Sequence, residues 1–145
     1  MKTSTLLRIA AVITFLYFAG HTAGIPWTPG EGAADAAVIE AMKSDHFPVF
    51  GVSRSYWDFY FGFGVTISVV LLAQAVILWQ LAALAKTDAA RLRPIIATFF
   101  VAFVLNAILG WMYFFAIPAV MATVIATFLA IAFVTAGKRV GTNLT

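Results

Sequence analysis

Two side chains in this sequence are placed to exchange a proton at the edge of an apolar environment. His21 lies inside a run from Ile9 to Gly30 that has no charged residue, and Asp58 directly precedes a second such run, from Phe59 to Ala85. A histidine titrates near neutral pH, and a carboxylate at an apolar boundary can serve as an acid or a base. His21 and Asp58 are therefore the candidate catalytic pair, and the nearby Arg54 is a candidate for binding an anionic group.

Further polar and aromatic residues share helix faces with this pair or lie at a similar depth. Tyr17 lies four residues before His21, and Asn106 lies seven before Tyr113, so each pair falls on one face of a helix. If these faces meet, they line a pocket that opens to the outer leaflet of a membrane. The predicted ligand-binding residues are Tyr17, Arg54, Tyr56, Tyr60, Asn106 and Tyr113.

Each candidate also has a structural interpretation, which the sequence leaves open. His21 lies between two glycines spaced four residues apart, a pattern typical of helix contacts, where an imidazole can hydrogen-bond to a neighbouring helix. Ser55 and Asp58 form an S-x-x-D pattern that caps the start of a helix. Asn106 can join two helices, and tyrosines are typical of the aromatic belt at a membrane boundary.

The elements that must position these residues are membrane-spanning helices. The run from Ile95 to Gly137 has no charged residue and is long enough for two crossings, which need about 20 apolar residues each. With 63% hydrophobic and only 10% charged residues, the chain is predicted to be all-α, an integral membrane four-helix bundle. It forms one transmembrane domain over residues 1–145, with an outer loop at 26–55. The spans are expected at about residues 6–25, 56–85, 95–115 and 118–137.

The charges that flank these spans predict their orientation. Lys and Arg gather at the N-terminus, between the second and third spans, and in the C-terminal tail, whereas the loop at 26–55 is mainly acidic. By the positive-inside bias, both termini are expected in the cytoplasm. We expect the first span to be retained rather than removed as a signal peptide. Because the basic residues report topology, the net charge of +3 does not indicate a nucleic-acid partner.

The outer loop is predicted to contain a short amphipathic helix, from about Pro29 to Lys43. Thr28 and Glu31 form a T-x-x-E capping box at its start. Apolar residues then recur at helical spacing, at Ala34, Val38, Ala41 and Met42. This helix is expected to lie over the outer ends of the bundle or in the headgroup layer, either as a cover or as a lid for a substrate.

An aromatic block at the start of the second span is the most distinctive stretch of the sequence. It reads Ser53-Arg54-Ser55-Tyr56-Trp57-Asp58-Phe59-Tyr60-Phe61-Gly62-Phe63-Gly64. Together with Gly20-His21-Thr22, Asn106 and Trp111-Met112-Tyr113-Phe114-Phe115, it resembles a group of small bacterial four-span proteins with no known activity. The resemblance implies a bacterial inner membrane. In size the chain is also similar to DoxX-like and sterol-isomerase-like membrane domains, but no motif of either carries over residue by residue.

Two classes of function follow, and the sequence does not decide whether the protein is an enzyme. In the first, a lipid, quinone or terpenoid-like molecule binds in the outer-leaflet pocket, where His21 and Asp58 supply acid-base chemistry. In the second, the chain is a non-catalytic assembly subunit. Its small-residue helix faces, at Ala126, Ala130, Ala132 and Ala136, would pack against a second copy or a larger membrane complex.

Metal and cofactor chemistry has little support in the sequence. Cysteine is absent, which excludes thiolate metal sites and disulfides, and no metal site is predicted. Haem binding through His21 and His46 is disfavoured, because Phe47 and Pro48 predict that His46 lies in a loop. A channel or transporter is the third choice, because His21 is the one titratable residue expected within the spans. The cofactor, if there is one, is unknown.

Overall fold

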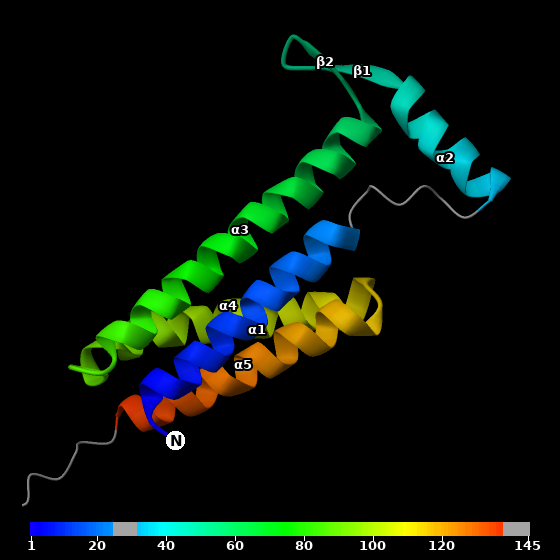
Figure 1. The fold of residues 1–145 in the computed structure, drawn as a ribbon. Helices are drawn as coiled ribbons and strands as arrows, with labels where there is room; N and C mark the ends of the chain where they lie inside the picture. The colour runs from blue at the N-terminus through cyan, green and yellow to red at the C-terminus, as the bar shows by residue number, and fades with distance from the viewer. Residues whose placement is uncertain (25–31, 138–145) are drawn as a thin grey trace, which may run out of the picture. The chain divides into compact units, whose positions relative to one another are not determined.

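The structure, a computed structural model, describes residues 1–24 and 32–137. In this part of the chain, four helices are long and apolar enough to cross a membrane, which confirms the helical class of the fold. They are α1 (Thr3–Gly24), α3 (Tyr56–Leu84), α4 (Arg93–Tyr113, preceded by the 3-10 turn η1, Ala90–Leu92) and α5 (Ala116–Ala136). Between α1 and α3 lie the short helix α2 (Ala33–Ser44) and the strands β1 (His46–Val49) and β2 (Val52–Ser55) (Figure 1).

The two prolines near helix starts fall where a helix tolerates them. Pro94 is the second residue of α4, so its missing N–H leaves no hydrogen bond unmade. The turn before it is held by Asp88, whose carboxylate accepts the Arg91 N–H at 3.2 Å and pairs with the Arg91 Nε at 2.8 Å. Pro118 is the third residue of α5, which begins two residues earlier than predicted, at Ala116.

The chain divides into two compact units, and each is described by itself. The core unit contains the described residues of 1–17 and 71–145, and the loop unit contains those of 18–70. The helices α1 and α3 each contribute residues to both units.

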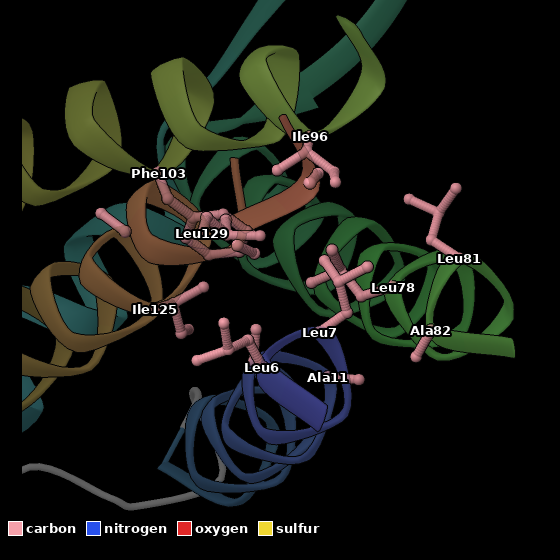
Figure 2. Close-up of a cluster of buried hydrophobic side chains, with 14 of the residues drawn as sticks. Leu6, Leu7, Ala11, Leu78, Leu81, Ala82, Ile96, Phe103, Ile125 and Leu129 are labelled. Carbon is pink, nitrogen blue, oxygen red and sulfur yellow. The ribbon is translucent and has the colours of Figure 1, made fainter. Parts of the chain in front are cut away.

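Four helices supply the buried side chains of the core unit. Figure 2 shows one apolar cluster of Leu6 and Leu7 of α1, Leu78 of α3, Phe103 of α4, and Ile125 and Leu129 of α5. All six are at most 1% exposed. Many equally large apolar side chains, including Val101 and Leu105, are about half exposed. That distribution suits a bundle surrounded by hydrocarbon, where packing rather than exclusion of water holds helices together.

The helices α4 and α5 form the antiparallel hairpin that the short connection predicts. Only Phe114 and Phe115 separate them. Near this connection the two backbones come very close, since a Cβ atom on Gly110 would lie 3.0 Å from the Cα of Ala119. Glycine is therefore required here by space rather than by backbone conformation. At the other end of the unit, the Thr3 and Thr135 hydroxyls share a hydrogen bond at 3.0 Å between their Oγ1 atoms, which joins α1 to α5.

In the loop unit, the sequence prediction missed a β-hairpin. β1 and β2 pair antiparallel, with His46 opposite Ser55 and Val49 opposite Val52. His46 therefore begins a strand, and its predicted place in a loop was wrong. The two turn residues, Phe50 and Gly51, have φ angles of 48° and 83°. Positive φ at both central residues is the geometry of a type I′ turn, whose twist matches the flanking strands.

The segment between α1 and α3 contains a helix, α2, while its amphipathic character and its place over the bundle stay predictions from the sequence. It begins at Ala33, after Gly32 with φ of 120°, while the proposed cap at Thr28 and Glu31 lies outside the described residues. None of its residues is buried. Of the predicted apolar stripe, Met42 is half-buried, whereas Ala34, Val38 and Ala41 are exposed. Ile39, which was not part of that prediction, is also half-buried.

Candidate functional site

His21 is held near the end of α1 by a hydrogen bond to α3. Its Nε2 atom lies 3.1 Å from the carbonyl oxygen of Gly64. Because a carbonyl oxygen can only accept, Nε2 carries the hydrogen and donates it. One turn along α3, the Ser68 hydroxyl accepts a hydrogen bond from the Thr22 hydroxyl at 2.9 Å. We call His21, Thr22, Gly64 and Ser68 the polar clamp.

The polar clamp defines what His21 can do chemically. With the hydrogen on Nε2, the lone pair of the neutral ring is on Nδ1, which is the atom available for proton transfer. The His21 ring is half-buried, so the protein covers part of it. The contact with Gly64 is the helix-joining role that the flanking glycines indicated for His21.

Asp58 and Ser55 form the helix cap that their spacing predicts. The Ser55 N–H donates to Asp58 Oδ2 at 2.8 Å, and the Asp58 N–H donates to Ser55 Oγ at 3.2 Å. These two reciprocal hydrogen bonds cap the first turn of α3. Ser55 is 3% exposed, so the cap is shielded from solvent. Arg54 donates from Nη1 to the Ser53 carbonyl oxygen at 2.9 Å, and among the described residues it forms no ion pair with Asp58. That Arg54 binds an anionic group stays a prediction from the sequence.

Tyr56 and Tyr60 belong to an aromatic cluster around the first two turns of α3. The Phe47 ring, from β1, lies 4.8 Å from the Tyr56 ring and 6.0 Å from the nearly parallel Phe59 ring. The Trp57 ring contacts Tyr60 at 5.7 Å. The ammonium of Lys43, at the end of α2, lies 4.9 Å from the Trp57 ring, within range of a cation–π interaction. We call this cluster the aromatic collar: Phe47, Tyr56, Trp57, Phe59, Tyr60 and Phe63.

The other predicted ligand-binding residues belong to the core unit. Tyr17 is half-buried and packs against the apolar cluster of that unit. Asn106 is exposed, and Tyr113 is 71% exposed at the end of α4. The catalytic candidates and the tyrosines of the aromatic collar belong to the loop unit. That residues of both groups share one pocket stays a prediction from the sequence.

Sequence reasoning missed an apolar groove on the α4–α5 hairpin, within the core unit. Its volume is about 510 Å³. Small side chains, Ala107, Ala126 and Ala130, lie between bulkier ones. The complete lining is Phe100, Val104, Ala107, Ile108, Trp111, Thr123, Ala126, Thr127, Ala130 and Ile131. Ala126 and Ala130 are spaced four residues apart, which was the one signal of this groove in the sequence.

The polar atoms of the groove are hydrogen-bonded within its own walls. The Trp111 indole N–H donates to Thr123 Oγ1 at 3.3 Å, and that hydroxyl donates to the Ala119 carbonyl oxygen at 2.8 Å. The Thr127 hydroxyl donates to the Thr123 carbonyl oxygen at 2.9 Å. The groove therefore presents a largely apolar surface, with one long hydrogen bond from Trp111 at its rim.

Most of the small residues of α5 that were predicted to form an assembly surface pack within the protein itself. Ala132 and Ala136 are 0% and 3% exposed and belong to the core of the unit. They are not free to pack against another molecule, which corrects the residue set proposed for an assembly surface. Ala126, which is 6% exposed and belongs to the same core, and the half-buried Ala130 line the groove.

No protein-family model, curated protein or solved structure matches this chain. Within residues 1–24 and 32–137, no three His, Asp or Glu side chains gather where they could hold a metal ion. The four apolar helices are compatible with a multi-pass membrane protein, which is the class that the fold defines.

Proposed function

We propose that this multi-pass membrane protein binds a hydrophobic small molecule, with a lipid-like or isoprenoid-like chain, in the groove between α4 and α5. The observation that carries the proposal is the groove itself, which is apolar and has a volume of about 510 Å³. Its threonine hydroxyls and its indole N–H are already hydrogen-bonded within the protein. Such a surface offers shape to a hydrocarbon chain and no competing polar group.

Selectivity in this setting depends on packing. A lipid-soluble molecule gains nothing from leaving water when it is already in the bilayer, so its affinity comes from dispersion contacts and from matched shape. The alanines at 107, 126 and 130 leave room for a chain to lie close to both helix backbones. Trp111 stands at the rim and is 59% exposed, and its hydrogen bond of 3.3 Å is long enough to be exchanged for one to a ligand headgroup.

The depth of the groove in the membrane follows from the proposed topology of the chain. With both termini in the cytoplasm, the connection between α4 and α5 faces the outside of the cell. The groove runs from Phe100, within α4, to Trp111 near the end of that helix. It would then open to the outer leaflet of the bacterial inner membrane. Acid-base chemistry by His21 and Asp58 is a separate prediction, since neither residue belongs to the groove.

Native mass spectrometry with groove variants tests the proposal. Protein purified in mild detergent is incubated separately with farnesol, with an isoprenoid quinone and with phosphatidylethanolamine. The parent protein is expected to retain at least one of them. Ala130→Phe fills the groove and should reduce the bound fraction at least tenfold, whereas the matched variant Ala102→Phe, on the exposed side of α4, should bind like the parent. No adduct on the parent, or equal binding by both variants, would refute the proposal.

The alanines that line the groove also favour a second candidate occupant, a helix from another copy of the chain. A helix from another copy of the chain can approach closely where alanines line a groove. The mass spectra distinguish the two functions, because an assembly subunit would appear as a dimer without added lipid. If Ala130→Phe converts that dimer to a monomer and Ala102→Phe does not, the groove is an assembly surface rather than a ligand site.

A further inference from the structure

The tip of the β-hairpin exposes an aromatic side chain in an unfavourable backbone conformation. Phe50 is 105% exposed, and its φ of 48° lies in the left-handed region. Bulky residues rarely adopt this region, and type I′ turns favour Asn-Gly or Asp-Gly at these two positions. The local needs of the turn therefore do not account for a phenylalanine here. Strain of this kind at an exposed position is a reason to look for a function.

The residues around Phe50 make the whole tip apolar. Val52 is 46% exposed and Pro48 is also exposed, while Val49 is half-buried. We call Pro48, Val49, Phe50 and Val52 the apolar tip. Between residues 46 and 55 there is no carboxylate, and Arg54 is the one full positive charge. The hairpin is thus suited to a surface that is apolar below and carries anionic groups above.

The hairpin is fixed to the start of α3 without a linker. β2 ends at Ser55, which caps α3 at the next residue. The Phe47 ring of β1 contacts the tilted Tyr56 ring and stacks on Phe59 in the first turn of α3. Figure 1 shows the hairpin extending to the side of the helix start rather than continuing along the helix axis. The exposed tyrosines of the aromatic collar are of the type that anchors a helix at a membrane boundary. The hairpin therefore starts at the depth of the headgroups.

We propose that the apolar tip inserts into the headgroup layer of the same membrane that α3 crosses. Phe50 would rest among the upper parts of the acyl chains, and Arg54 would lie near lipid phosphates. The lipid surface is preferred as the occupant because the hairpin is joined directly to a membrane-crossing helix and extends sideways from it. The conformational strain at Phe50 is then offset by the contacts of its ring with lipid.

Spin labelling tests this placement, because the chain has no native cysteine. Phe50→Cys and Val52→Cys variants are labelled and reconstituted in vesicles of phosphatidylcholine with phosphatidylglycerol. Glu40→Cys, on exposed α2, is the control. Power saturation compares collisions with oxygen, which concentrates in lipid, and with a water-soluble nickel chelate. We expect oxygen collisions to exceed nickel collisions several-fold at both tip positions and the reverse at Glu40.

Three outcomes would overturn the proposal. Nickel collisions that dominate at both tip positions would place the tip in water. Low collision rates with both reagents would mean that a protein covers the tip, and dipolar broadening between labels would identify that protein as a second copy of the chain. The variant at Val52 keeps Phe50 and its turn unchanged, so a folding defect of Phe50→Cys does not decide the result. None of these outcomes depends on whether the α4–α5 groove holds a ligand.

Discussion

The Cα atom of Ala119 lies 3.0 Å from the point where a Cβ atom on Gly110 would be. No side chain fits between these two residues, so α4 and α5 touch backbone to backbone beside their connection. In a membrane, where water does not drive helices together, such close contact is a main source of stability. The two helices are also joined by a hydrogen bond from the Trp111 indole N–H to Thr123 Oγ1 at 3.3 Å.

Gly110→Val is therefore expected to lower the free energy of unfolding by about 1–3 kcal/mol, the usual cost of overpacking. The measurement is unfolding in detergent micelles, followed by circular dichroism. Gly62→Ala is the matched control, because a Cβ atom at Gly62 meets nothing within 4 Å. Alanine is the better helix former by about 1 kcal/mol, so the control should be neutral or stabilised. Equal losses in both variants would mean that the close contact is not the cause.

Loss of the cap on α3 should be measurable and shared between its two residues. Ser55→Ala and Asp58→Ala are each expected to lower stability by about 0.5–2 kcal/mol, because each removes part of one reciprocal hydrogen-bonded pair. The double variant should lose less than the two single losses added together. Arg54→Ala should leave stability unchanged, since its hydrogen bond to Ser53 is on the surface. Additive losses would argue that Asp58 does something other than capping.

His21→Phe tests whether the polar clamp is structural. The ring is kept, but the hydrogen bond to Gly64 is lost, and we expect stability to fall by roughly 0.5–1.5 kcal/mol, as for other interhelical hydrogen bonds in membranes. His46→Phe, at an exposed strand position, is the control and should change little. A His21→Phe protein with unchanged stability and reduced retention of a bound isoprenoid would support the predicted His21 pocket.

Phe50→Asn should separate folding from membrane contact. It creates the Asn-Gly pair that type I′ turns favour and removes the ring from a left-handed position. Stability in detergent is expected to rise by about 1 kcal/mol, on the scale of the cost of left-handed conformation. Thermal unfolding in detergent measures the gain. A fall in stability would show that the Phe50 ring makes contacts that fold the loop unit.

Cysteine labelling measures the predicted orientation. A membrane-impermeant thiol reagent should label Ala36→Cys in intact cells, because α2 is expected outside. It should label Ala90→Cys, in the basic connection before α4, only after the cells are opened. Both positions are exposed in the fold, so access to the reagent depends on the side of the membrane. Labelling of Ala90→Cys alone in intact cells would reverse the topology.

The helices could be predicted from the sequence because their signals are local. Charge-free runs locate the spans, and the S-x-x-D cap places the start of α3 at Tyr56, where the structure has it. The hairpin was missed because Phe50-Gly51 lacks the usual turn signal and Pro48 is unusual in a strand. Pro48 is tolerated because it lies opposite Ser53, next to the Val49–Val52 pair that closes the turn, at a position that needs no N–H.

The groove could not be predicted for a different reason. The helices α4 and α5 are apolar on all sides, so no periodicity indicates which faces meet. Ala130 and Ala132 look equivalent in the sequence, yet one lines the groove and the other is fully buried. That difference arises from the rotation of α5 about its axis, which turns Ala132 toward the core and Ala130 toward the groove. Tertiary contact, not composition, decides the role of each small residue.

The connection of Phe114 and Phe115 also has a consequence for biosynthesis. Because only two residues separate them, α4 and α5 are expected to enter the bilayer together, as one hairpin. Their contacts are close in sequence, so the pair can form as soon as α5 has been translated. The segments of α1 and α3 in the core unit would then pack against a hairpin that is already complete. Defects at Gly110 should consequently reduce the amount of protein that is inserted, even at temperatures where the mature fold is stable.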